Sequence, residues 1–248
     1  MKKLAIASAL LATLPALEAQ AQNMNWAGWY AGAGVGYSEV KGNWKNKQSY
    51  FTGGAPFVFP GSDQSDDMRA NGAIASLNLG YNWAVAPKWV VGAEAAWFYA
   101  DQDTKSNDIP GLSPIGNSYA KFTAKDGAFV KGRLGYLAAP STMIYGSAGA
   151  IYQRFNAKAV CPADTNVCNP ALGTQAYSSN GSEWGWTLGA GLEHAFTKNW
   201  IGRVDYSYAN FGSSSFWAMV PVAGVSHGSH ARISPTSQTL TFGVNYKF

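Results

Sequence analysis

The chain is 248 residues long, and only 13% of its residues are charged, whereas 14% are aromatic and 28 residues are glycine. A soluble domain carries about 25% charged residues, so this composition disfavours an ordinary soluble domain. The formal net charge of +4 is small and scattered, which excludes a strongly basic nucleic-acid-binding protein.

Residues 1–21 have the features of a secretory signal peptide. A basic start (MKK), an apolar stretch over 4–17 and the small-residue sequence AQA at 19–21 match the parts of such a peptide. We expect cleavage after residue 21 and a mature domain over 22–248. Loss of two lysines and one glutamate from 18 basic and 14 acidic residues leaves 16 and 13, a net charge of +3. The mature domain has no apolar run of about 18 residues, so it has no helical membrane span.

The mature chain alternates apolar and polar residues and shows no sustained helical periodicity. Eight such segments are bounded by glycine, proline, asparagine and serine, which is the pattern of half-buried β-strands. Their ends are predicted to within about two to four residues. The predicted strands are Trp29–Val40, Asn71–Trp83, Trp89–Asp101, Ala128–Leu137, Met143–Phe155, Ser182–Phe196, Trp200–Asn210 and Ser237–Phe248.

The connections between these strands alternate between short and long. AVAPK, AAPST and TKN form the second, fourth and sixth connections, whereas the other four exceed twenty residues. Barrels of the outer membrane keep this rhythm, with short periplasmic turns and long extracellular loops. The sequence therefore predicts an all-β fold, an eight-stranded antiparallel transmembrane up-and-down β-barrel with four long extracellular loops. Its expected location is the outer membrane of a Gram-negative cell.

One face of the strand predicted over 89–101 has aromatic residues at its ends and small apolar residues between them. Ten residues at about 3.3 Å each, tilted by about 40°, rise roughly 25 Å, the height of the apolar band in such barrels. Aromatic residues also flank the short turns, and we assign them to a girdle at the membrane boundary. They are Trp83, Trp89, Tyr136, Tyr145, Phe196 and Trp200.

Six charged residues fall on the opposite face of the strands, which alternation assigns to the barrel interior. Three acids balance three bases, and unpaired charges in a narrow lumen are costly. Because they occur on neighbouring strands, we expect opposite charges to pair across each ladder. Inward glycines (32, 34, 36, 189 and 191) are expected to make room for the long basic side chains. The six are Glu94, Lys131, Arg133, Glu193, Arg203 and Asp205.

Two interpretations of these charges remain open, because they either fill the lumen or line a narrow, gated pore. Eight strands enclose an interior just wide enough for side chains, whereas open aqueous channels occur at about sixteen strands. We therefore favour a filled lumen, and we keep a small pore or solute channel, which would need oligomers, as the alternative.

Two cysteines and two histidines fall in predicted loops. Cys161 and Cys168 have six residues between them, and in an exported chain this predicts a disulfide that closes a small loop. His227 and His230 lie in VSHGSHAR, in the same loop as an apolar aromatic run. Such a pair of imidazoles could ligate haemin iron, but two ordinary polar loop residues are the simpler interpretation.

The sequence indicates no enzyme, cofactor or metal site. It has no phosphate-binding loop, metal-ligand cluster or nucleophile elbow, and the serines at 213–215 share a loop with His227 but have no acid beside them. The first long loop carries Lys41, Lys45 and Lys47 among aromatic residues. These lysines suit lipopolysaccharide phosphates or a neighbouring surface, although a loop folded over the barrel mouth is the simpler interpretation.

Several stretches resemble the small porin-like, opacity-type outer-membrane barrels of alphaproteobacteria. They are WAGWYAGAGVGY, GYNWAVAPKWVVGAEAAW, KGRLGYLAAPSTMIYGSAGAIY, GWTLGAGLEHAFTKNWIGRVDYSYANFG and TLTFGVNYKF, which cover nearly all strands and short turns. The resemblance implies an eight-stranded barrel with an envelope-supporting or surface-antigen role and, in some members, haemin binding or pore activity. It also implies that the C-terminal strand, ending in Tyr246 and Phe248, is read by the barrel-insertion machinery.

The final strand is predicted to close the barrel. Leu240, Phe242, Val244 and Tyr246 would face lipid, and Phe248 would join the periplasmic girdle. We expect a structural and surface role, with a small pore or a haemin receptor as alternatives. The expected partners are outer-membrane lipids, lipopolysaccharide, the insertion machinery and further copies of the chain, but no nucleic acid.

Overall fold

A computed structural model describes residues 24–51, 56–57, 65–106, 119–161, 174–219 and 227–248. Every strand in these ranges belongs to one antiparallel sheet. The described part of the chain contains no helix that is long and apolar enough to cross a membrane.

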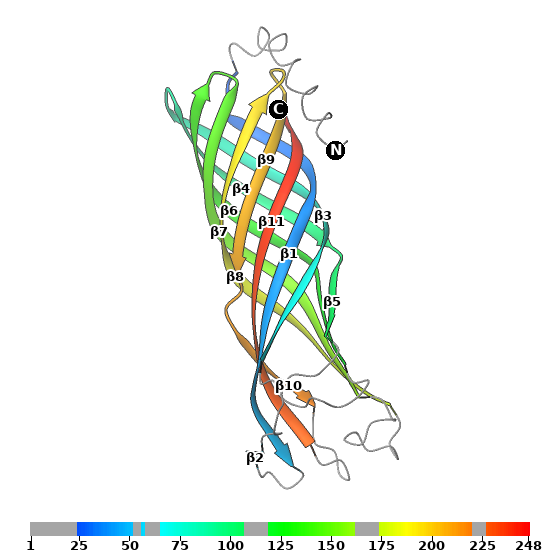
Figure 1. Ribbon diagram of the computed structural model, residues 1–248. Helices are drawn as coiled ribbons and strands as arrows, with labels where there is room; N and C mark the ends of the chain where they lie inside the picture. Colours follow the sequence, from blue (N-terminus) through cyan, green and yellow to red (C-terminus); the bar gives the residue numbers. More distant parts are fainter. Residues whose placement is uncertain (1–23, 52–55, 58–64, 107–118, 162–173, 220–226) are drawn as a thin grey trace, which may run out of the picture.

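Eight of the described strands close into a barrel (Figure 1). Each pairs with the next along the chain, and the last pairs with the first, so the backbone groups of the ring are satisfied within it. The predicted eight-stranded up-and-down barrel is confirmed. The strands are β1 (Gly28–Phe51), β3 (Ser65–Ala86), β4 (Trp89–Ala100), β6 (Tyr119–Ala139), β7 (Thr142–Cys161), β8 (Gln175–Ala195), β9 (Trp200–Asn210) and β11 (His227–Lys247).

Three shorter strands add to the sheet away from the short turns. β2 (Pro56–Phe57) pairs with β1, β5 (Gln102–Ser106) pairs with β3 and β6, and β10 (Ser214–Met219) pairs with β11. The short turns follow β3, β6 and β8 at the other end, where β1 begins and β11 ends (Figure 1). We call the end with the short turns periplasmic and the other end extracellular.

Six of the eight strands of the ring are longer than predicted, whereas β4 and β9 agree with their predicted bounds to within one residue. β1 continues to Phe51 instead of ending near Val40, and β11 begins at His227 instead of Ser237. Parts of the predicted long loops are therefore strand. The alternation continues there, but the hydrophobic face changes sides, so that Val40 and Trp44 are buried inside while Lys41 and Lys45 point outward.

Large apolar side chains cover the outside of the barrel in a band that we call the apolar belt. Aromatic residues border it near the turns, for example Trp29 and Trp89, and at its outer edge, for example Tyr37 and Trp97, all at least 43% exposed. On β4 the exposed and buried residues alternate without exception. On β11 the expected lipid-facing residues are exposed: Leu240, Phe242, Val244 and Tyr246.

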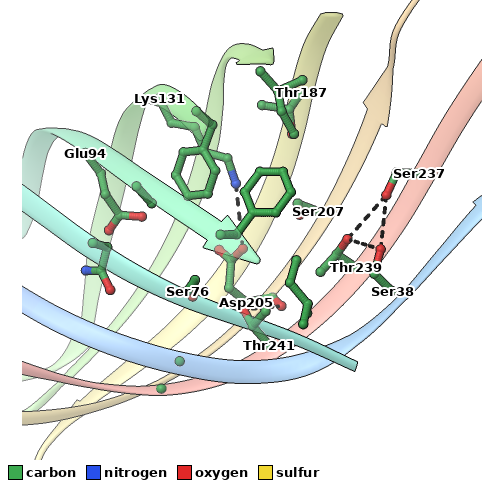
Figure 2. A pocket seen from close by; sticks show the side chains of 18 of the residues that line it. Ser38, Ser76, Glu94, Lys131, Thr187, Asp205, Ser207, Ser237, Thr239 and Thr241 are labelled. Carbon is green, nitrogen blue, oxygen red and sulfur yellow. Dashed lines mark hydrogen bonds and ion pairs between the residues drawn. The ribbon is translucent and has the colours of Figure 1, made fainter. Parts of the chain in front are cut away.

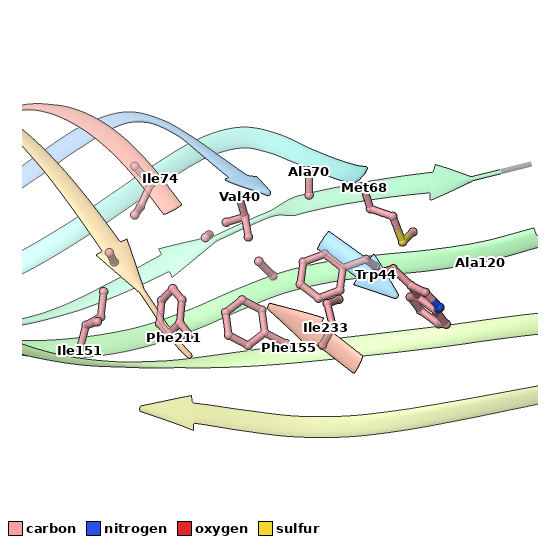
Figure 3. Close-up of a cluster of buried hydrophobic side chains, with 14 of the residues drawn as sticks. Val40, Trp44, Met68, Ala70, Ile74, Ala120, Ile151, Phe155, Phe211 and Ile233 are labelled. Atoms are coloured by element: carbon pink, nitrogen blue, oxygen red, sulfur yellow. The ribbon is translucent and has the colours of Figure 1, made fainter. Parts of the chain in front are cut away.

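The interior of the barrel has three layers along its axis. Near the turns lies a periplasmic cluster, formed by Trp26, Val90, Met143, Tyr145, Ala195 and Ile201. The charged residues occupy the middle layer. Beyond them lies an extracellular cluster (Figure 3), formed by Val40, Trp44, Met68, Ala70, Ile74, Phe98, Ala100, Ala120, Phe122, Ala124, Ile151, Phe155, Ala159, Ala209, Phe211, Ala231 and Ile233.

Candidate functional site

The middle layer contains all six charged residues that alternation assigned to the interior. Their side chains are at most 9% exposed, because each lies on the inward face of its strand. Four strands contribute them: β4, β6, β8 and β9. We call the set the charge network, and its members are Glu94, Lys131, Arg133, Glu193, Arg203 and Asp205.

Glu94 is the centre of the charge network. Arg203 donates two hydrogen bonds to it, from Nη1 to Oε2 at 2.7 Å and from Nη2 to Oε1 at 3.2 Å. Arg133 donates a third from Nη1 at 3.3 Å, and its Nη2 lies 2.8 Å from Glu193 Oε2 in an ion pair. This two-pronged arginine–carboxylate geometry is a strong form of the ion pair.

The pairing agrees only in part with the one expected between neighbouring strands, because Arg133 of β6 pairs with Glu94 of the adjacent β4 as expected, whereas Arg203 pairs with it from β9. Glu94 lies opposite Lys131 in the β4–β6 ladder, yet its ion-pair partners are Arg133 and Arg203. The pair between Arg203 of β9 and Glu94 of β4 crosses the lumen. Inward side chains converge on the axis of a narrow barrel, so an arginine can reach a strand that is not its neighbour.

Lys131 also reaches across the lumen. Its Nζ lies 3.9 Å from Asp205 Oδ1 on β9 and 4.1 Å from the ring centre of Phe129 (Figure 2). Arg203 Nη2 lies 3.7 Å from the other oxygen of Asp205. The three acids and three bases therefore form one connected set, and a mutation of one member leaves a partner charge buried.

Two tyrosines complete the network, and sequence reasoning did not assign either of them to it. Tyr30 donates to Glu94 Oε2 at 2.9 Å and accepts from Arg133 Nη1 at 2.7 Å. Tyr145 donates to Asp205 Oδ2 at 2.8 Å, and its ring centre lies 4.1 Å from the Arg133 guanidinium carbon. The assignment of Tyr145 to the membrane girdle is wrong, since the residue is only 5% exposed.

A signal for the inward tyrosines exists in the sheet register. Tyr145 lies opposite Gly135 on one side and Gly191 on the other, and a Cβ added to Gly191 would lie 2.5 Å from the tyrosine ring. Tyr30 lies opposite Gly80 in the same way, and a Cβ added to Gly80 would lie 2.3 Å from the Tyr30 ring. A large ring that points into a narrow lumen needs small neighbours. An aromatic residue whose cross-strand neighbours are glycines is therefore predicted to point inward.

The inward glycines accommodate more than basic side chains. A Cβ at Gly32 would lie 2.0 Å from Asn245 Oδ1, and Gly191 faces Tyr145. Asn245 in turn donates to Glu193 Oε1 at 3.3 Å. Two other glycines lie against arginines, since added Cβ atoms at Gly92 and Gly243 would approach Arg133 and Arg203 to 3.0 and 3.2 Å.

A small cavity lined by both polar and apolar side chains lies between the charge network and the extracellular cluster (Figure 2). Its volume is about 50 Å³, and its walls include Lys131, Asp205 and a group of hydroxyls. Thr239 donates to Ser38 at 2.9 Å, and the hydroxyl oxygens of Ser38 and Ser237 lie 3.2 Å apart. At about 10–15 Å³ for each water the volume suits a few waters, whereas ligand pockets measure about 300–1,000 Å³.

Hydrophobic residues close the lumen on both sides of the polar layer. At the periplasmic end, Trp26 precedes β1 and is 3% exposed, and its Nε1 donates to the carbonyl of Pro140 in the β6–β7 turn at 3.1 Å. In the extracellular cluster the Phe122 and Phe155 rings stack at 5.5 Å, and Phe211 meets Phe155 edge-on at 5.1 Å. The interior is therefore filled by side chains along the described strands.

The family model for the outer membrane protein beta-barrel domain matches residues 6–248. The chain belongs to this family. It is thus an integral outer-membrane β-barrel protein, and the resemblance to small alphaproteobacterial outer-membrane barrels is confirmed.

Relatives of this outer-membrane barrel include two proteins of Brucella. The 31 kDa outer-membrane immunogenic protein of Brucella melitensis is 28% identical over 234 residues, which are 93% of this chain and 87% of that protein. The 25 kDa outer-membrane immunogenic protein of Brucella abortus is 30% identical over 198 residues, 71% of this chain and 78% of that protein. Among solved structures, the outer membrane protein OprG from Pseudomonas aeruginosa has 18% sequence identity to this chain. Its crystal structure matches with a TM-score of 0.47 over 92% of this chain and 99% of that one.

Several predicted sites of the outer-membrane barrel lie outside the described residues. They are the signal peptide at 1–21, the Cys168 half of the predicted disulfide, and the side chains of Cys161, His227 and His230. The backbone of both histidines forms part of β11 rather than a loop. These features stay predictions.

The C-terminal aromatic residues are described. Phe248 is 69% exposed and Tyr246 is 38% exposed on the outer surface. Their rings meet at 5.5 Å, and Tyr246 also contacts Trp200 at 5.1 Å. The end of β11 thus lies in the aromatic border near the turns.

Proposed function

We propose that the protein is a closed structural barrel that supports the outer membrane and is exposed at the cell surface. We also propose that a single chain does not conduct ions. The observation that carries this proposal is the filled lumen, with a cavity of only about 50 Å³ between two hydrophobic layers. An ion crossing the barrel would have to displace the Arg203–Glu94 pair and pass the stacked phenylalanines. Both steps are costly in a medium of low dielectric constant.

Single-channel recording of the purified protein in planar bilayers tests this proposal. We expect no steady conductance steps from the wild type. Steady steps in the wild type that disappear in Lys131→Ala/Arg133→Ala would overturn the proposal in favour of a pore lined by the charge network. Because that variant could fail to fold, its mobility on gels before and after heating is measured on the same preparation.

Opening the two hydrophobic layers provides a sharper form of the same experiment. Phe122→Ala/Phe155→Ala removes the stacked rings, and Trp26→Ala removes the periplasmic cover. If the layers seal the lumen, a variant with all three changes should conduct ions at least transiently. Variants that keep one of the two layers should not conduct. Tyr37→Ala, at an exposed aromatic of the belt, is the matched control.

We infer that the surface role belongs to the extracellular part of the barrel. The two Brucella relatives are named outer-membrane immunogenic proteins, which supports a surface-antigen role for this chain. Labelling of intact cells with a membrane-impermeant amine reagent should modify exposed lysines such as Lys45 and Lys125, and protection of both would contradict this orientation.

The proposal includes three finer features of export and assembly. Residues 1–21 direct export, a disulfide joins Cys161 to Cys168, and the insertion machinery reads the C-terminal Tyr246 and Phe248. The exposed aromatic pair at the chain end supports the last feature. Phe248→Ala should reduce the amount of barrel in the outer membrane, measured by cell fractionation, without changing the stability of protein refolded in detergent. The partners are outer-membrane lipids and lipopolysaccharide, and further copies of the chain.

A further inference from the structure

Beyond the apolar belt, the described strands leave the ring open on one side. β9 pairs with β8 only as far as Asn210, which lies opposite Trp186. Among the described residues, positions 175–185 of β8 pair with β7 alone, and β10 pairs with β11 alone. We call the gap between these two strand edges the seam. In Figure 1 the extracellular ends of β7 and β8 run to the lower right, away from β10.

The turn between β9 and β10 opens the seam. Gly212 has a φ of +71°, a left-handed conformation that favours glycine, and its N–H donates to Asn210 Oδ1 at 2.8 Å. Phe211 between them is buried in the extracellular cluster. The chain therefore leaves β8 at this turn and continues as β10 along β11. At the base of the seam the Ser214 hydroxyl donates to Glu183 Oε1, which joins the two edges through side chains.

The other side of the ring shows how the same place can be filled. There β5 continues β4 after Asp101 and pairs with both of its neighbours, since Asp103 lies opposite Asn71 of β3 and opposite Thr123 of β6. β5 thus joins β3 to β6 beyond the belt. β10 continues β9 in the corresponding position but pairs with only one neighbour, so the seam is a local feature of the β8 side.

The two edges of the seam lack the usual protection against strand addition. Natural edge strands are protected by lysine, proline or bulges, because their unpaired N–H and C=O groups can pair with another chain. Positions 175–185 read QAYSSNGSEWG, and β10 reads SSFWAM. Neither stretch contains a basic residue or a proline, and Glu183 is the one charged residue in both. The seam therefore suits an extended peptide backbone.

The surroundings of the seam indicate which side chains such a peptide would carry. Lys158 of β7 lies opposite Ser178 of β8, and Arg232 of β11 lies opposite Ser215 of β10. Neither base forms an ion pair with any residue that the structure describes. Long basic side chains can extend over the short serines toward the seam. On the inner face, the half-buried Ala157 packs against the extracellular cluster.

We propose that the seam binds an extended segment of another protein whose side chains alternate between apolar and acidic. The segment pairs with β8 and β10, its acidic side chains face Lys158 and Arg232, and its apolar side chains cover the extracellular cluster. A second copy of the chain fits less well, because the two edges offer only one acid, Glu183. This inference goes beyond the envelope role proposed above and does not depend on whether the barrel conducts.

A labelled peptide of about eight residues that alternates valine and glutamate tests the proposal. Fluorescence anisotropy measures its binding to the protein refolded in detergent micelles, and absence of binding would overturn the proposal. Lys158→Gln/Arg232→Gln should weaken binding about tenfold, at roughly threefold for each exposed charge pair. The matched control Arg69→Gln/Lys105→Gln removes two bases from the side that β5 fills and should bind as the wild type. Equal losses in the two variants would contradict the assignment to the seam.

Three further measurements test the mode of binding. The same peptide methylated on alternate backbone nitrogens cannot donate along one edge and should lose its affinity, whereas unchanged affinity would show attraction between charges without strand pairing. A peptide of valine and lysine should bind much more weakly, and equal binding would overturn the proposed charge complementarity. A dimer detected by light scattering in peptide-free micelles, and dissociated by the peptide, would show that a second copy occupies the seam instead.

Discussion

The part of the barrel inside the apolar belt and the part beyond it use the same strands with opposite hydrophobic faces. Within the belt, Val35 and Tyr37 of β1 face outward, while the interior holds the charge network. Only a few residues further along β1, Val40 and Trp44 are buried inside, and Lys41 and Lys45 face outward. The surrounding solvent, lipid or water, decides which face is apolar, while the strand itself continues unchanged.

The comparison also concerns polar contacts. Inside the belt the ion pairs are almost completely buried, so each group depends on its partner. Beyond the belt, pairs such as Lys41–Glu39 lie in water, so water can hydrate each charge when its partner is lost. Four sets of substitutions test whether equivalent changes have different effects in the two parts.

The largest effect is expected from removal of the central acid of the charge network. Glu94→Ala leaves Arg133 and Arg203 buried without their shared partner, which should lower the free energy of unfolding by about 3–5 kcal/mol. Glu39→Ala removes the partner of Lys41 beyond the belt and should change it little. Denaturant titration of tryptophan fluorescence in micelles measures both. Equal changes would mean that the lumen is hydrated enough to screen its charges.

Outward substitutions on one strand provide the second test. Val130 is 61% exposed within the belt, and Thr123 faces outward beyond it on the same strand β6. Val130→Arg should destabilise the protein in lipid by about 2–4 kcal/mol, because arginine near the bilayer centre is poorly solvated. Thr123→Arg should be nearly neutral. A similar cost at both positions, measured by reversible unfolding from lipid vesicles, would show that the belt is misplaced.

Two tyrosine hydroxyls allow a closely matched comparison. Tyr145 donates to buried Asp205 at 2.8 Å, and Tyr37 donates to exposed Asn71 at 2.7 Å. Tyr145→Phe leaves a buried carboxylate without one donor and should cost about 1.5–3 kcal/mol, whereas Tyr37→Phe should cost little, because water replaces the lost partner. The ratio of the two losses, rather than either value, decides how dry the lumen is.

The smallest effect is expected on the pH dependence of stability, through an ion pair that lies beyond the belt. The hydrogen bond from Arg154, together with its charge, lowers the pKa of the Asp126 carboxyl below its usual range. The pair therefore contributes stability above the ordinary carboxyl pKa, and this contribution is lost as the pH falls through the lowered value. Asp126→Asn should remove a small part of the acid sensitivity of unfolding. An unchanged pH profile in the variant would mean that water screens the pair completely.

Alternation, turn length and aromatic borders were sufficient to predict the barrel, its strand number and its inward charges. They failed at the strand ends, because the loss of outward hydrophobicity near Val40 was interpreted as the end of a strand, although only the solvent changes there. They predicted the ion pairs only in part, since Glu94–Arg133 joins neighbouring strands as expected but Glu94–Arg203 does not. Alternation gives the face of Glu94 but not how far Arg203 reaches across the lumen, which depends on the barrel radius and on glycines such as Gly243.

The ladder that closes the barrel has a consequence for the order of assembly. It joins β1 to β11, and its register runs from Tyr30 opposite Lys247 to Phe51 opposite His227, so it pairs residues 217 to 176 positions apart in the sequence. Contacts of such separation form late and slowly, since the intervening chain must first be ordered. Until the last strand has been delivered, β1 has an unpaired edge along its 24 residues, and a chain shortened at its C-terminus would keep that edge open to other strands.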